Sequence, residues 1–269
     1  MYSLLNLFLN SNIYNKSPKF IARKIFKLFK IFFVETNLQY LPNNNHPTNI
    51  DKIEQLKLIE KSKNQFYKPF NTCHFMLEVF SIYESFKKKI KVLDFGANNI
   101  DNYLYLNKYL RNWEYIYHDL SHYNNLVKNL IKEKDLKNIT VIEDCSTIKE
   151  PLDFAIFGSS IHYVNNYKEI LEKNFFHKSQ YIIFSHTPFH DSEYKKNDIV
   201  VKQVNISPVI NYAYLIYYKS FISFMNKNGY ELISENKNNF IKFLNFKNFK
   251  NFNFINFLDL IFVYNKKII

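Results

Sequence analysis

Three acidic residues follow three successive apolar segments that have the length of buried β-strands. Asp94 lies in KVLDF, Asp119 ends WEYIYHD and Asp144 ends NITVIED. Neighbouring parallel strands end at the same edge of a sheet, where ligands bind. Asp119 comes 25 residues after Asp94, which suits an acid that accepts hydrogen bonds from ribose hydroxyls, and Asp144 could accept one from an adenine amino group. Each acid alone fits a solvated loop or a helix cap better, but together they predict a nucleoside-binding edge.

A glycine follows the first of these acids. In DFGANNID (94–101), Gly96 would let the backbone approach a ligand, and the amides of the next helix would face the same ligand. The chain has three glycines, Gly96, Gly158 and Gly229, so each suggests a backbone requirement. Because one glycine is a weak motif by itself, the interpretation depends on the elements around it.

Apolar strand-like segments alternate with amphipathic helical segments from residue 91 onward. The predicted helices cover 100–111, 122–134, 165–175 and 212–228, and the predicted strands cover 91–95, 113–119, 138–144, 152–158, 180–186, 230–235 and 257–265. This order predicts an α/β fold with a mostly parallel seven-stranded sheet and helices on both faces. The last two strands have no helix between them, so we expect the final strand to be antiparallel.

Residues 1–49 are expected to form a basic, amphipathic helical arm ahead of an α/β domain over 50–269. Within 18–33, one helical face carries Ile21, Ile25, Leu28, Phe29 and Phe32, and the other carries Lys19, Arg23, Lys27 and Lys30. Two interpretations stay open. The helix could pack on the domain with its bases in water, which we favour, or it could contact an anionic membrane surface peripherally.

The net charge of +12 is concentrated at the ends of the chain. Residues 1–34 contribute +6 and residues 235–269 contribute +4. A nucleic-acid enzyme usually carries its basic groove on the catalytic body, so no nucleic-acid partner is expected. An apolar content of 47% excludes extended disorder. Two cysteines exclude a disulfide scaffold, and no apolar run is long enough to span a bilayer. We expect a cytoplasmic protein.

The segment 236–257 is low in complexity and rich in Phe and Asn. It could be a long hairpin connection that lays Phe side chains on the domain surface. It could also contact a partner or a membrane, because a large exposed aromatic patch is usually covered. The sequence does not decide between these interpretations.

The motifs resemble a known family. KVLDFGANNIDNYLY is similar to the first motif of class I S-adenosylmethionine-dependent methyltransferases, and more narrowly to that of a methyltransferase-like family of surface-polysaccharide biosynthesis clusters. The similarity covers roughly residues 90–265 and includes FGSSIHYV (157–164), HTPF (186–189), IVVKQV (199–204) and the segment 211–232. The sequence departs from the family at Ala97 and Asn98, at Ile100, which replaces a glycine, and at His186, which replaces an arginine.

The resemblance implies a Rossmann-like methyltransferase fold, S-adenosylmethionine as cofactor, and a sugar or surface-glycan precursor as the acceptor of the methyl group on a hydroxyl. His162 and His186 are the candidate catalytic residues, because a base of near-neutral pKa helps to deprotonate a hydroxyl. No metal is expected, since Pro188 separates His186 from His190. The resemblance implies that the cofactor is bound by Asp94, Phe95, Gly96, Ala97, Asp119, Asp144, Cys145 and Ser159.

An alternative stays open because the first motif is poor in glycine. The domain could have lost catalysis and could serve as a binding or scaffold protein of a glycan-assembly pathway, at the membrane surface. Ile100 is the residue on which this alternative depends, because a branched side chain there would narrow the space for the cofactor. The sequence does not indicate an oligomeric state.

Overall fold

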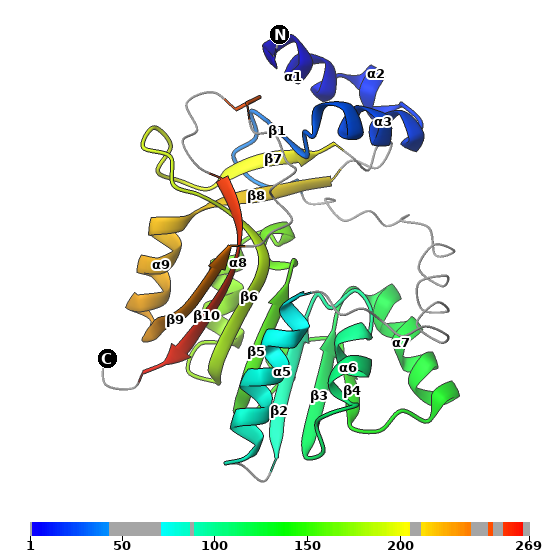
Figure 1. Ribbon diagram of the computed structural model, residues 1–269, viewed down its shortest axis with the longest axis vertical. Coiled ribbons are helices and arrows are strands. Elements are labelled where there is room, and N and C mark those ends of the chain that lie inside the picture. The colour runs from blue at the N-terminus through cyan, green and yellow to red at the C-terminus, as the bar shows by residue number, and fades with distance from the viewer. Residues whose placement is uncertain are drawn as a thin grey trace.

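The computed structural model describes residues 2–42, 71–86, 89–204, 211–237, 247–249 and 255–265. Its central feature is a mixed sheet of ten strands (Figure 1). Eight of the strands follow the order β1-β7-β8-β6-β5-β2-β3-β4. The other two, β9 and β10, are attached through the pairing of β10 with β6.

The part of the sheet formed by strands β2 to β6 is parallel. In the order β4-β3-β2-β5-β6 its strands are Ile139–Ile142, Trp113–His118, Ile90–Phe95, Leu152–Gly158 and Ser179–His190. Helices α6 (Asp101–Leu106), α7 (Ser121–Lys134) and α8 (Tyr167–Asn174) connect them. The chain first builds outward from β2 to β4 and then returns to place β5 on the other side of β2. The strand order therefore reverses between β2 and β5, which is where open α/β sheets bind ligands.

The sheet closes with an antiparallel pair of strands. Helix α9 (Tyr218–Lys227) leads into β9 (Tyr230–Lys237), and β10 (Ile255–Tyr264) runs antiparallel to both β9 and β6. The seven strands expected from the sequence are all present, and the last is antiparallel as predicted. The expected α/β class is confirmed.

Three strands extend the sheet beyond the predicted seven. The predicted helix over 212–228 was wrong in its first part, because Asn211–Tyr217 is strand β8 and only Tyr218–Lys227 is helical. β8 pairs with β7 (Ile199–Gln203), and β7 pairs with β1 (Phe33–Glu35). The segment NYAYLIY is buried along nearly all its length, and a continuous apolar run does not distinguish a buried strand from a helix by its periodicity.

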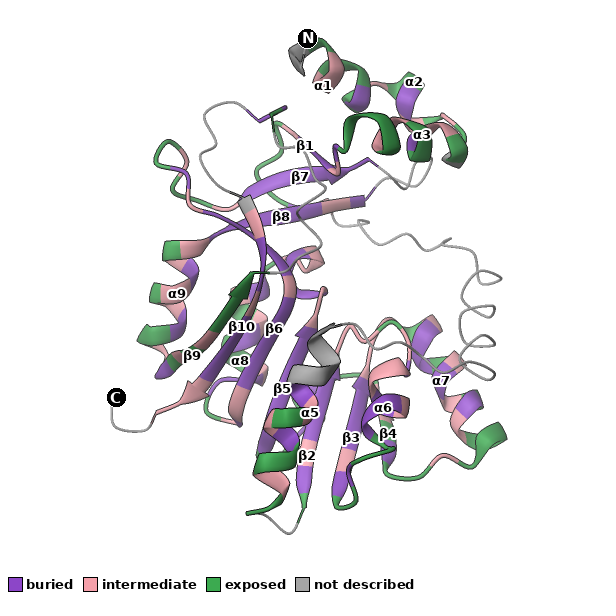
Figure 2. Cartoon of the chain, in the orientation of Figure 1, coloured by how far each residue is buried: buried purple, intermediate pink, exposed green. Residues whose placement is uncertain are grey.

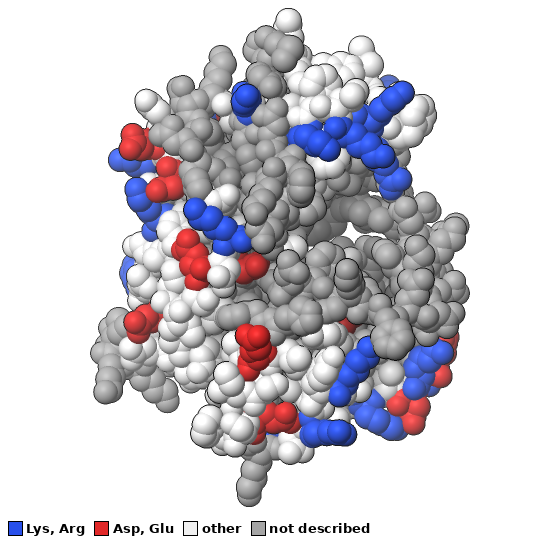
Figure 3. All heavy atoms as spheres, viewed as in Figure 1, with Lys and Arg blue, Asp and Glu red and all other residues white. Residues whose placement is uncertain are grey.

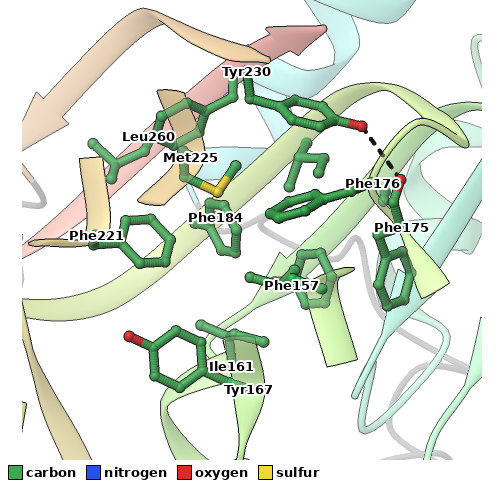
Figure 4. Packing of buried hydrophobic residues seen from close by; sticks show 14 of the residues in the cluster. Phe157, Ile161, Tyr167, Phe175, Phe176, Phe184, Phe221, Met225, Tyr230 and Leu260 are labelled. Atoms are coloured by element: carbon green, nitrogen blue, oxygen red, sulfur yellow. Dashed lines mark hydrogen bonds between the residues drawn. The ribbon is translucent and has the colours of Figure 1, made fainter. Parts of the chain in front are cut away.

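Each face of the sheet has its own hydrophobic core. Phe154 and Ile156 of β5 face a cluster with α5 (Asn71–Glu84), α6 and α7, whereas Ala155 and Phe157 face a cluster with α8 and α9. The strands between them are buried (Figure 2). The second cluster is aromatic (Figure 4), and the ring of Phe184 lies at its centre, 5.2 Å from Phe157 and 5.0 Å from Phe221 between centroids.

The N-terminal arm packs against the end of β7. It contains α1 (Tyr2–Asn10), α2 (Asn12–Asn15) and α3 (Lys19–Phe29). The buried ammonium of Lys202 donates hydrogen bonds to the carbonyl of Leu9 and to Oδ1 of Asn15, and burial lowers the pKa of Lys202 to about 8. Because a buried cation is costly unless it is hydrogen-bonded, these contacts hold the arm on the sheet.

Helix α3 differs from the helix predicted over 18–33. It ends at Phe29, because Lys30 has a left-handed backbone with φ of 55°. Leu28, which was expected on the packed face, is exposed, while Ala22 is buried. The boundary expected between residues 49 and 50 lies outside the described residues.

Part of the Phe-rich segment 236–257 packs on the arm and the sheet. Asn248 Nδ2 donates to the carbonyl of Phe33 over 2.8 Å, and Phe249 and Phe257 are buried in a cluster with Phe33. Most of the segment from 238 to 254 lies outside the described residues. Among the helices that the structure describes, none has the length and apolar character needed to cross a membrane.

We expect Phe184→Ala to lower the free energy of unfolding by about 3–5 kcal/mol, because it removes a fully buried ring and leaves a cavity. Urea unfolding followed by circular dichroism would measure this loss. Phe86→Ala is the matched control, because Phe86 is exposed and should change stability by less than about 0.5 kcal/mol. Equal effects of the two substitutions would contradict the packing described above.

Candidate functional site

Two turns meet where the strand order reverses. Gly96 follows β2 with a φ of +65°, and Ser159 and Ser160 follow β5. Ser160 Oγ donates to the carbonyl of Phe95 over 2.7 Å. A Cβ on Gly96 would lie 2.5 Å from Cβ of Ser160, and a φ of +65° disfavours any residue with a side chain. This position therefore requires glycine for two independent reasons.

Two cavities open beside these turns. The β3 cavity has a volume of about 480 Å³ and lies at the ends of β2 and β3. The β6 cavity has a volume of about 390 Å³ and lies at the ends of β5 and β6. Asn98, Gly158, Ser159 and Tyr163 line both cavities, so the two are adjacent. A Cβ on Gly158 would meet no atom within 4 Å, and the missing side chain thus leaves space in the shared wall.

Asp119 fixes the wall of the β3 cavity. Its Oδ2 accepts a hydrogen bond from the amide of Asn98 over 2.5 Å, and its Oδ1 accepts one from the amide of Leu120 over 2.6 Å. Asn98 has a left-handed φ of 60°. Burial raises the pKa of Asp119, while the two amides oppose that effect. The carboxylate therefore ties the turn after β2 to the end of β3.

His118 lines the same cavity and was not singled out in the sequence. Its ring stacks on Phe95, with centroids 4.9 Å apart and an interplanar angle of 12°. Its Nδ1 is buried and has no hydrogen-bond partner among the described residues. Burial lowers the pKa of His118, against the effect of Asp119 and of a backbone hydrogen bond at Glu143, so the neutral ring is favoured at pH 7. Its position directly before Asp119 was the only signal that could have revealed it.

Asp94 lies beneath the turn and is fully buried. Its Oδ2 accepts hydrogen bonds from the hydroxyl of Tyr115 and from Nδ2 of Asn102, the latter over 2.9 Å. Its Oδ1 has no partner in the described part of the chain. Burial raises the pKa of Asp94 to about 6, against the effect of its two donors. Asp94 thus positions Asn102, which lines the β6 cavity.

His186 lies in a β-bulge on the wall of the β6 cavity. The register between β6 and β10 shifts between Leu258 and Leu260, and Asp259 Oδ1 accepts a hydrogen bond from the amide of His186 over 2.8 Å. His186 has a left-handed φ of 50°, and such bulges redirect a side chain. Burial lowers the pKa of His186, partly offset by Asp259. A neutral imidazole therefore lines the cavity at pH 7.

The added strands supply a polar wall opposite the turns. Gln203 at the end of β7 lines the β6 cavity, and Asn211 at the start of β8 lines the β3 cavity. Gln203 Oε1 accepts hydrogen bonds from the hydroxyl of Tyr163 over 3.1 Å and from Nδ2 of Asn211 over 3.3 Å. Sequence reasoning missed both side chains, although IVVKQV contains Gln203, because the pairing of β7 with β8 decides where they lie.

Most of the residues predicted to bind a cofactor gather at these cavities. Those that line at least one cavity are Phe95, Gly96, Ala97, Asp119 and Ser159, and Asp94 acts on the wall through Asn102. Asp144 and Cys145 line neither cavity. Asp144 is exposed and accepts hydrogen bonds from the amide and hydroxyl of Ser146. Cys145 is buried in the core, which raises its pKa to about 12.

His162 and Ile100 both point into the protein. His162 is fully buried, lines neither cavity, and has no partner for either ring nitrogen in the described structure. Burial is the main cause that lowers the pKa of His162 to about 3, and the charge of the neighbouring His186 is the second cause. Ile100 is buried in the core with α6 and lines neither cavity. Ile100, at the position where the family that the sequence resembles has a glycine, therefore does not narrow the cavities.

Solved structures share this arrangement of strands and helices. The N-terminal domain of EvdMO1, crystallised in the presence of SAH and D-fucose, matches with a TM-score of 0.51 and 12% identity over 79% of this chain and 97% of that one. The 1,6-didemethyltoxoflavin-N1-methyltransferase of Burkholderia thailandensis, with bound 1,6-didemethyltoxoflavin and S-adenosylhomocysteine, matches with a TM-score of 0.50 and 8% identity over 87% and 95%. The chain has a methyltransferase fold. No family model and no curated protein matches the sequence.

At sequence identities of 12% and 8%, these matches are evidence for the fold of the chain alone. Within this methyltransferase fold, the chemistry therefore depends on the side chains at the two cavities. The polar groups there include the carboxylates of Asp119 and Asp101, the neutral imidazoles of His118 and His186, and the amides of Gln203 and Asn211. Such a set can bind hydroxyls and a nucleoside and can accept a proton.

We expect Asp94→Asn to stabilise the protein at pH 7 relative to wild type, because it removes a buried charge while one side-chain oxygen still accepts from Tyr115 and Asn102. The folded-state pKa of about 6 is above the ordinary 3.8, so the folded wild type holds its proton longer than the unfolded chain. Its stability should fall as the pH rises from about 4 to about 6, by about 3 kcal/mol in all. Thermal unfolding across this range would measure the difference.

The matched control for this test is Glu133→Gln, which neutralises an exposed carboxylate on α7. The stability of this variant should change with pH in the same way as that of the wild type. A wild-type protein whose stability rises between pH 4 and pH 6 relative to Asp94→Asn would show that Asp94 is stabilised as a carboxylate, contrary to the buried site described here.

Proposed function

We propose that this protein transfers a methyl group from S-adenosylmethionine to a hydroxyl of a sugar or glycan precursor. The observation that carries the proposal is the pair of adjacent cavities that share the Gly158–Ser159 wall where the strand order of a methyltransferase fold reverses. The two volumes are within the range of small-molecule sites, about 300–1,000 Å³. The β3 cavity has the Asp119 carboxylate, which is suited to a nucleoside, and the β6 cavity has the neutral His186 together with the carboxylate of Asp101, which are suited to an acceptor.

The residues of the β3 cavity fit the nucleoside part of the cofactor. The Asp119 carboxylate is positioned by two amides, and an acid at this strand end accepts hydrogen bonds from ribose hydroxyls. The ring of His118, stacked on Phe95, lines the same cavity. The absent side chain of Gly158 leaves room beside them. Phe95, Gly96, Ala97 and Ser159 complete the walls, whereas a cofactor contact of Asp144 and Cys145 stays a prediction.

When bound, the cofactor supplies an electrophilic methyl group on a sulfonium. The protein must then align the acceptor hydroxyl and exclude water. In the β6 cavity, the Gln203 amide can bind acceptor hydroxyls, while Phe32 and Phe257 cover an apolar face. A ring nitrogen of His186 can take the hydroxyl proton, because the low pKa of this histidine keeps it neutral at pH 7.

The sugar class of the acceptor is inferred from two sources. One is the resemblance of FGSSIHYV and HTPF to the surface-polysaccharide family, since His162 and His186 belong to these motifs. The other is the D-fucose present with the EvdMO1 domain of the same fold. A base at His162 is less favoured than one at His186, because His162 does not line a cavity. The alternative of an inactive binding protein is weakened by the inward position of Ile100.

We expect the purified chain to bind S-adenosylhomocysteine, and Gly158→Leu to weaken this binding by at least about tenfold, equivalent to about 1.4 kcal/mol. The leucine would fill the shared wall without meeting another atom at its Cβ, so the fold should persist. Isothermal titration gives the affinity, and circular dichroism checks the fold. Ser81→Leu, on the exposed side of α5, adds the same side chain away from both cavities and should bind as the wild type does. Unchanged binding by Gly158→Leu would remove the proposed cofactor position.

We expect His186→Asn to lower kcat by about 10²–10⁴-fold while leaving S-adenosylhomocysteine affinity unchanged, because it removes the base and keeps the bulge. Transfer of a labelled methyl group to a panel of nucleotide sugars and free sugars would measure this. The wild-type rate should fall on the acid side as pH drops through the His186 pKa, which is below 6.5, and the variant should lose this limb.

Two results would count against this mechanism. A His186→Asn enzyme with wild-type kcat would exclude the base, and His162→Asn would then be the next variant to test. A protein that binds the cofactor but methylates no sugar in the panel would overturn the acceptor class without affecting the cofactor site. A cytoplasmic location and a peripheral contact of residues 18–33 with an anionic membrane stay predictions that are independent of the reaction.

A further inference from the structure

The outward side of α3 carries large apolar side chains and bases together. Phe20 and Leu28 are 67% and 72% exposed, and Arg23, Lys24 and Lys27 are exposed between them. Residues three, four, seven and eight positions apart lie on the same side of an α-helix. These five residues therefore form one face, here named the arm surface, which differs from the apolar face that the sequence indicated because Leu28 belongs to the exposed side.

The arm surface has a single sign of charge. Residues 1–34 contain no acidic residue, and Lys24 and Lys27 make no ion pair in the part of the chain that the structure describes. Figure 3 shows the basic side chains of the arm gathered over α3, away from the acidic side chains on this view of the molecule. The surface is therefore complementary to a negatively charged partner.

The arm presents this surface from a fixed position. Ala22 on the opposite side of α3 is buried in a cluster with Leu9 and Tyr14, and Lys202 ties α1 and α2 to β7. Helix α1 adds exposed Leu4 and Leu7 to the same small unit, which shows green on its outer sides in Figure 2. Isolated exposed apolar residues are common in proteins, but several of them interleaved with bases are typical of helices that lie in a membrane interface.

We propose that the arm surface docks the protein on an anionic lipid bilayer. Phe20 and Leu28 enter the boundary between headgroups and acyl chains, while Arg23, Lys24 and Lys27 contact the anionic headgroups. A second copy of the chain is a poorer occupant, because a symmetric dimer places the same patch on both subunits and would set these bases against each other. This docking is independent of the proposed methyl transfer.

The test is co-sedimentation of the full chain with vesicles of phosphatidylcholine alone or mixed with phosphatidylglycerol. Wild type should bind the mixed vesicles and bind phosphatidylcholine weakly. Lys24→Glu with Lys27→Glu should lower the partition coefficient by at least about tenfold. Phe20→Ser with Leu28→Ser should also lower it. High salt should weaken binding, because the Debye length falls from about 8 Å at 0.15 M to about 3 Å at 1 M.

Matched controls change the same chemistry elsewhere on the surface. Lys108→Glu with Lys132→Glu makes the same charge change on the α/β body, and Ile82→Ser with Ile233→Ser removes exposed apolar side chains of α5 and β9. Both controls should sediment much more like the wild type than the arm variants do. Equal loss by the controls, or a wild type that ignores phosphatidylglycerol, would overturn the proposal. A third result would also overturn it. In that case the wild type binds no vesicles, and light scattering shows that it is a dimer which Phe20→Ser with Leu28→Ser dissociates.

Discussion

The site depends on the close contact between the turn after β2 and the turn after β5. Gly96 comes so near Ser160 that no side chain fits between them, and the Ser160 hydroxyl holds the carbonyl of Phe95. The two turns are thus joined into one structural unit, and both cavities take their shared wall from it. This steric requirement explains why a chain with only three glycines has one here.

The buried polar groups around this contact are not all satisfied. Both carboxylate oxygens of Asp119 accept hydrogen bonds from backbone amides. In contrast, Oδ1 of Asp94 and Nδ1 of His118 have no hydrogen-bond partner among the described residues. Unpaired buried groups cost free energy. Their concentration beside the cavities means that the protein is locally destabilised where it would bind its ligand, as is common at functional sites.

The arm and the extra strands connect the outer surface of the molecule to the site. The segment that leaves α3 contributes Phe32 to the β6 cavity and then pairs as β1 with β7. At the C-terminal end of β7, where Phe33 pairs with Gln203, the side chain of Gln203 lines the same cavity, and beside it Lys202 holds the arm. A single short strand therefore supports both the acceptor wall and the helices that carry the arm surface, so the position of the arm and the shape of the cavity are mechanically linked.

The sequence by itself determined the seven strands of the α/β sheet, the antiparallel end and the glycine turn, because apolar segments of strand length and their bounding residues are local signals. Only the tertiary structure decided β8, since NYAYLIY is buried on both faces and has no helical or strand period. It also decided His186, whose direction is set by a bulge against Asp259, 73 residues away, and it turned Ile100 and Cys145 into the core. Local periodicity specifies the type of an element, whereas the direction of a side chain at a strand end depends on the register of the strand beside it.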